Sequence, residues 1–201
     1  LSIFTANQNN VFANFEFVSP NEFCGRIVLK KIDNHYEDSL YQQGNMKWLL
    51  YNILQDASLK TDRDFKAIFD YINDDYLKLL HFANVIADLY DQYFIYRQEM
   101  VEAWNKGQAY AQFKDERFKE IEKWQKKLFL KLKEEVYACH EQQMGDKIFH
   151  DRVSLKNELL KQLDAGNKQL IQSIKEIGSV SFFGLSVMTR YHFDIIKAIS
   201  R

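Results

Sequence analysis

The chain has 201 residues, of which 46% are hydrophobic and 15% aromatic, so it can fill one packed domain, alone or with a small appendage, and is not disordered. Its 27 Lys and Arg against 28 Asp and Glu give no global electrostatic signature for nucleic acid or for an anionic membrane. Any contact with nucleic acid must therefore be local.

A mainly α fold is predicted by the scarcity of breaking residues, one proline and seven glycines, and by apolar residues at three- and four-residue spacing. Asp62 is expected to cap the N-terminus of one helix, and residues 73–75 are expected to separate that helix from the next. The helix that begins near Met46, which includes Trp48, is expected to be buried on nearly all sides. We expect helices at 46–55, 65–72, 75–96, about 100–106, 115–141, 155–165 and 191–199.

Two short segments break the helical pattern and are expected to be strands. The first contains Phe15 and Phe17, and the second contains Val180, Phe182 and Phe183. We expect them to be two short strands of one parallel sheet in a truncated α/β domain, with a helical domain inserted between them. The expected division is a first α/β remnant at 1–25, the helical domain at 26–178, and the returning strand and helix at 179–201.

Motifs for catalysis and for metal or nucleotide binding are absent from the sequence. It has no phosphate-binding G-x-x-x-x-G-K-[ST] loop, no H-E-x-x-H and no nucleophile elbow, and Cys24 and Cys139 lack C-x-x-C spacing. We therefore predict no catalytic residue, no metal and no cofactor. No apolar run has the roughly 20 residues of a membrane span, and no signal peptide is present, so we expect a cytoplasmic protein. Leu1 and the apolar stretch before Arg201 suggest a piece of a longer chain.

Polar residues crowd one otherwise apolar helix. Asp88, Gln92 and Tyr96 share a face at i, i+4 and i+8, with Asp91 beside them and Arg97 following. An aspartate can accept a hydrogen bond from the amine of cytosine, and an arginine can bind guanine or a phosphate, so this patch could meet DNA. The alternative is that the aspartates only cap, or pair with a nearby arginine to hold helices together.

At these residues the sequence resembles the RecC family, the gamma subunits of exodeoxyribonuclease V. The run A-D-L-Y-D-Q-Y at 87–93, followed by Tyr96, Arg97, Trp104 and Gly107, is similar to a RecC segment. The order of further matches extends along almost the whole chain, at 14–17, 20, 23, 47–48, 124–125, 128–129, 152, 155 and 183–186.

The resemblance implies a helicase-like domain, called 1A, that is interrupted by a helical domain 1B. It further implies a noncatalytic DNA-handling subunit of an ATP-dependent exonuclease and helicase complex in double-strand-break repair. Its expected partners are RecB-like and RecD-like subunits and single-stranded DNA, which the subunit would scan for the recombination hotspot Chi.

The same resemblance implies DNA contacts by Asp88, Leu89, Asp91, Arg97 and Arg152. Ser19, Gly25 and Gln98 depart from the family pattern, so DNA scanning is expected to persist while the recognised sequence differs or is absent. The alternative function is a helical scaffold or protein-interaction module, including an AddB-like subunit. A basic groove past Arg97 and Arg152 would favour DNA, and a large exposed apolar patch would favour a protein partner.

Overall fold

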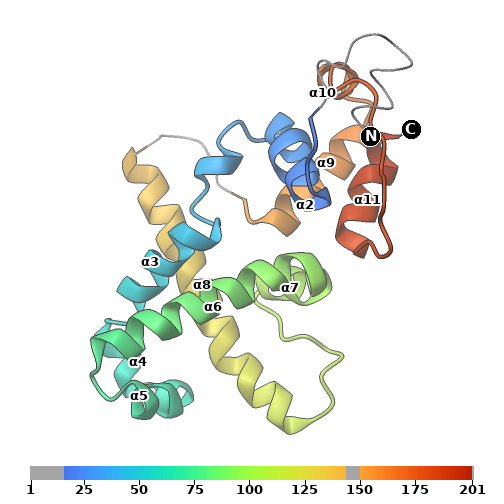
Figure 1. Cartoon of the computed structure of the whole chain (residues 1–201). Coiled ribbons are helices and arrows are strands. Elements are labelled where there is room, and N and C mark those ends of the chain that lie inside the picture. The colour runs from blue at the N-terminus through green and yellow to red at the C-terminus, as the bar shows by residue number, and fades with distance from the viewer. Residues whose placement is uncertain (1–15, 144–149, 201) are drawn as a thin grey trace.

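The structure, a computed structural model, describes residues 16–143 and 150–200 and is mainly helical (Figure 1). This confirms the predicted helical class. The helices and helical turns are α2 Pro20–Glu22, η1 Phe23–Val28, η2 Leu29–Lys31, η3 Tyr36–Asp38, α3 Gln43–Ile53, α4 Ala57–Thr61, η4 Arg63–Phe65, α5 Lys66–Ile72, α6 Tyr76–Tyr96, α7 Gln98–Asn105, α8 Glu116–Gln143, α9 Arg152–Asp164, α10 Lys168–Lys175 and α11 Arg190–Ile199. Within these two ranges, no helix is both long and apolar enough to cross a membrane.

Local sequence explains where the long helix α6 begins. Asn73 and Asp74 adopt left-handed backbone conformations with φ of 49° and 55°, which end α5. The carboxylate of Asp75 then accepts hydrogen bonds from the backbone N–H groups of Leu77, at 2.8 Å, and Lys78, at 3.2 Å. An aspartate N-cap of this kind satisfies donors that have no partner inside the helix. The break predicted at 73–75 is confirmed.

A first hydrophobic core joins α3, α5, α6, α7 and α8. Aromatic rings fill its centre: Trp104 lies 5.6 Å from Phe129 and 6.3 Å from Tyr90, between ring centroids. The buried members are Tyr41, Met46, Leu50, Ile53, Leu54, Leu59, Phe65, Ile68, Ile72, Leu79, Ala83, Ile86, Ala87, Tyr90, Phe94, Met100, Val101, Trp104, Leu128, Phe129, Leu132, Val136 and Val153.

The expectation that the helix near Met46 is buried on nearly all sides is wrong. Trp48 is 52% exposed, although Met46 and Leu50 are fully buried. The reason is that α3 contacts α6 and α8 along one face, so its other face remains open.

A second core joins segments from both halves of the chain. It buries Phe23, Cys24, Val28, Leu29 and Tyr36 against Leu155, Leu159, Leu170, Tyr191 and Ile195. Figure 1 shows the early helical turns beside α9, with α10 and α11 on the same side of the molecule. Burial raises the pKa of the Cys24 thiol to about 12, so this cysteine is an inert part of the core.

The two predicted strands are not formed in the described part of the chain. Phe15 lies outside it, and Phe17, Val180, Phe182 and Phe183 lie in irregular segments. A strand needs a neighbouring backbone to pair with, and neither segment has one there. Phe182 instead packs edge-on against the ring of Phe23, with 5.7 Å between centroids. The boundaries at 25 and 178 stay a prediction.

Candidate nucleic-acid interface

Asp88 and Leu89, the first two predicted DNA-contact residues in the chain, lie on α6. The carboxylate of Asp88 accepts hydrogen bonds from Gln92 Nε2 at 2.8 Å and from Gln43 Nε2 at 3.4 Å. The first contact confirms that Asp88 and Gln92 share a face. Leu89 is half-buried and packs against the first core. Asp88 therefore faces solvent, whereas Leu89 is turned partly inward.

Asp91 and Arg152 form an ion pair between α6 and α9. Their Oδ1 and Nη2 atoms lie 3.2 Å apart, and the side chains are only 21% and 9% exposed. Arg152 Nη2 also donates to Gln42 Oε1 at 3.0 Å, and the guanidinium lies over the Tyr36 ring, 5.9 Å from its centroid. The alternative that an aspartate pairs with an arginine to hold helices together is thus present for these two residues.

Polar atoms around Arg152 are incompletely paired. Arg152 Nε and Nη1, Tyr191 Oη and His192 Nε2 are buried and have no hydrogen-bond partner in the described part of the chain. Burial raises the pKa of Asp91, and the nearby Arg152 offsets this only in part. Because desolvation outweighs attraction here, the pair fixes the arrangement of helices more than it adds stability.

His192 gives this region a dependence on pH. Its pKa is lowered, first by burial and then by the charge of Arg152, whereas in the unfolded chain it returns to the usual 6.5. At a pH between the lowered pKa of the folded chain and 6.5, the unfolded chain binds more protons at His192 than the folded chain does. The stability that neutral His192 contributes is therefore fully present above pH 6.5 and is lost as the pH falls through the lowered pKa. We expect His192→Gln to weaken the fall in unfolding free energy between pH 7.5 and pH 5, measured by urea denaturation. His81→Gln, an exposed position on α6, is the control, and an equal fall in all three proteins would contradict this account.

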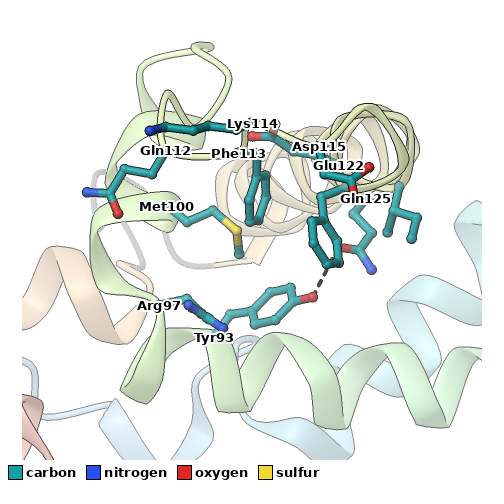
Figure 2. Close-up of a pocket in the computed structure, with 11 residues that line it drawn as sticks. Tyr93, Arg97, Met100, Gln112, Phe113, Lys114, Asp115, Glu122 and Gln125 are labelled. Atoms are coloured by element: carbon teal, nitrogen blue, oxygen red, sulfur yellow. Dashed lines mark hydrogen bonds between the residues drawn. The ribbon is translucent and has the colours of Figure 1, made fainter.

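Arg97 lies at the C-terminal end of α6, exposed, beside a cleft of about 510 Å³ (Figure 2). Among residues 16–143 and 150–200, no carboxylate is within ion-pair distance of Arg97 or of Lys114 on the opposite rim. The cleft is lined by Tyr93, Arg97, Met100, Gln112, Phe113, Lys114, Asp115, Phe118, Ile121, Glu122 and Gln125.

The carboxylates of this cleft are already engaged. Glu122 accepts hydrogen bonds from Trp104 Nε1 at 2.8 Å and from the backbone N–H of Tyr110 at 2.5 Å. Asp115 pairs with Arg117 at 2.7 Å. Arg97 and Lys114 are thus cations at the rim that no carboxylate of the described residues pairs with, whereas buried Glu122 keeps its negative charge, because its donors are neutral.

Comparison with known proteins identifies the family. The model of the RecC N-terminal domain matches residues 1–201. The chain belongs to this family. RecC subunits of the RecBCD enzymes of Escherichia coli (26% identity over 157 residues), Haemophilus influenzae (27% over 112) and Buchnera aphidicola of Schizaphis graminum (23% over 132) are similar to it. These alignments cover 77%, 54% and 66% of the chain but only 13%, 10% and 11% of the relatives.

For this RecC N-terminal region, the five predicted DNA contacts fall into two groups. Asp88 and Arg97 are exposed, and Leu89, Asp91 and Arg152 are half-buried or buried. Their contacts with DNA stay predictions. The described residues contain no group of three or more His, Cys, Asp or Glu side chains that could hold a metal ion.

Two parts of the site were not predicted from the sequence. Gln42 and Tyr36 contact Arg152 from a distant part of the chain, and no local pattern indicates this. The cleft wall formed by Phe113 and Lys114 left only a weak signal, two aromatic residues and one lysine in the segment 110–114.

Proposed function

We propose that this chain is the N-terminal, noncatalytic DNA-handling region of a RecC subunit, which acts with RecB-like and RecD-like subunits in double-strand-break repair and scans single-stranded DNA for Chi. The observation that carries the proposal is the match of the RecC N-terminal domain to the whole chain. The exposed polar end of α6, with the guanidinium of Arg97 that is unpaired among the described residues, is the surface best suited to meet DNA. The cytoplasmic location stays a prediction.

In this proposal the residues of the site have different roles. Arg97 contacts a base edge or a phosphate, and Asp88 accepts a hydrogen bond from a base. The Asp91 and Arg152 pair positions α6 against α9, and either side chain reaches DNA only if the pair opens. Leu89 supports the surface by packing. A reading surface needs such supporting contacts, since its side chains must be held in place.

We also propose that the helical part is a 1B domain inserted into a helicase-like 1A domain. The second core supports this, because it joins the early turns near Phe23 to α9, α10 and α11 around a separate set of buried residues. The first core lies almost wholly between Tyr41 and Val136. When a domain is inserted into another, the chain must leave the host domain and come back to it after the insertion, as it does in the second core.

The test uses the complete RecBCD-type complex with Arg97→Gln or Asp88→Asn in this subunit. We expect each change to weaken the response to Chi about tenfold, because one base contact is worth roughly 1–3 kcal/mol. The measurement is the change in DNA degradation at a Chi site, compared with degradation of Chi-free DNA, which is expected to stay unchanged.

Arg190→Gln is the matched control, since this arginine is also exposed, with 79% of its side chain accessible, but belongs to α11. A normal Chi response in both the Arg97 and Asp88 variants would refute the proposed reading surface.

A second candidate function is that of a protein-interaction module. The segment after α10 exposes a run of apolar side chains: Val180 42%, Phe182 42%, Phe183 83%, Leu185 41% and Val187 84%. Exposed apolar patches often mark contacts between proteins. If Phe183→Ser and Val187→Ser abolish assembly of the complex while the Arg97 and Asp88 variants leave Chi recognition intact, the interaction function is the better account.

A further inference from the structure

We propose that the cleft between α6, α7 and α8 is a single-nucleotide pocket, in which one base of a DNA strand inserts among the aromatic rings while Arg97 and Lys114 contact its phosphates. The inference rests on the proposed function and names a binding site in addition to the α6 surface. It assigns the cleft to unpaired DNA, because a base inside a duplex cannot enter such a pocket.

Size and lining fit a planar guest. The volume of about 510 Å³ lies in the usual range of small-molecule sites, roughly 300–1,000 Å³. Figure 2 shows Phe113 and Tyr93 across the cleft from one another, with Met100 beside them. Phe118 continues the wall, with its ring 5.8 Å from that of Phe113 and 54% of the residue exposed. These rings offer faces on which a base can stack, whatever its sequence.

The pocket is held open by hydrogen bonds that do not involve its rim. Tyr93 donates its hydroxyl proton to Gln125 Oε1 at 3.1 Å, which fixes the ring. Glu122 holds the α7–α8 connection by accepting the backbone N–H of Tyr110. The floor and the wall are thus set by contacts within the protein, and Phe113 can receive a guest without rearrangement of the core.

Charge favours a nucleotide over an aromatic side chain of a protein. Arg97 and Lys114 have no ion-pair partner in the described ranges, whereas Asp115 is paired with Arg117 and the charge of Glu122 is buried and hydrogen-bonded within the protein. A strand whose base enters the pocket carries phosphates on both sides of that base, which match two cations at the rim. A neutral apolar residue would leave both cations unused.

The experiment uses the full-length protein and thymidine oligonucleotides that carry one 2-aminopurine at successive positions. Stacking on the rings quenches this base, so we expect quenching at one position in the bound strand. Phe113→Ala should remove the quenching and weaken binding about tenfold, and Phe113→Tyr should restore both. Tyr76→Ala, which removes a ring that is 71% exposed elsewhere on α6, should change neither.

A second variant does not depend on the core. Lys114→Gln alters an exposed side chain, so folding is preserved, and it should reduce the salt dependence of binding by about one released ion. Lys168→Gln, an exposed lysine of α10, should leave the salt dependence unchanged if the strand runs through the cleft.

The outcomes separate this inference from the function on which it rests. Quenching that depends on Phe113 supports the pocket. Normal DNA binding in the Phe113→Ala and Lys114→Gln variants, with no quenching at any position, overturns the pocket and leaves the α6 surface in place. Absence of any binding of single-stranded DNA by the full-length protein overturns the proposed function itself.

Discussion

Replacing Arg152 with methionine is expected to lower the free energy of unfolding by about 3–5 kcal/mol, measured by urea denaturation at neutral pH. The change leaves the carboxylate of Asp91 in a mostly buried site without its cation, and Gln42 loses a donor. The cost therefore comes from an uncompensated charge, because methionine can still fill much of the volume.

A double-mutant cycle separates pairing from packing. Asp91→Asn alone should also be destabilising, because it leaves the guanidinium of Arg152 buried and unpaired. The two changes together should cost at least about 1 kcal/mol less than the sum of the single changes, since neither charge then remains. Arg190→Met, which removes an exposed arginine whose contacts with Glu99 and Asp194 are 3.7 Å and 3.9 Å long, should cost less than about 1 kcal/mol. Additive costs in the cycle would show that Asp91 and Arg152 are not coupled.

Trp104→Ala is expected to destabilise the chain by about 3–5 kcal/mol, because it empties the fully buried centre of the first core. The indole joins α7 to α6 and α8 through its contacts with Tyr90, Tyr93 and Phe129. Its Nε1–H also donates to the buried carboxylate of Glu122. The measurement is again urea denaturation of the purified chain.

Two further variants divide this cost. Trp104→Phe keeps a ring but removes the donor to Glu122, so it should cost about 1–3 kcal/mol. Trp48→Ala is the matched control, because this tryptophan is 52% exposed, and it should cost no more than about 1 kcal/mol. A loss at position 48 as large as that at position 104 would contradict the assignment of the first core.

Local sequence patterns predicted the helices well because their causes are local. Asp75 caps α6 through donors two and three residues away, and Asp88 meets Gln92 one turn later on the same face. The four-residue spacing of polar groups fixes this contact before any tertiary structure forms. The family resemblance was carried by the same stretch of α6.

The parts that the sequence could not supply depend on contacts between distant segments. Arg152 meets Asp91 and Gln42 only where α9 packs against α6, beside the residue that precedes α3. The apolar runs near Phe17 and Phe182 satisfied the strand pattern, but apolar composition alone cannot provide a neighbouring strand. The side chain of Phe182 found a partner in Phe23 although its backbone formed no strand. Tertiary packing overrode local propensity at these positions.

The most direct test of the central claim, that single-stranded DNA passes over the C-terminal end of α6, is photocrosslinking in the complete complex. A strand that carries 5-iodouracil at each position in turn would be irradiated, and the crosslinked peptides of this subunit identified by mass spectrometry. The account predicts crosslinks within 88–118, the stretch that contains Arg97 and Phe113, and a lower crosslinking yield there in the Arg97→Gln and Phe113→Ala variants. Crosslinks confined to other surfaces, such as the apolar segment 180–187, with none in 88–118, would contradict it.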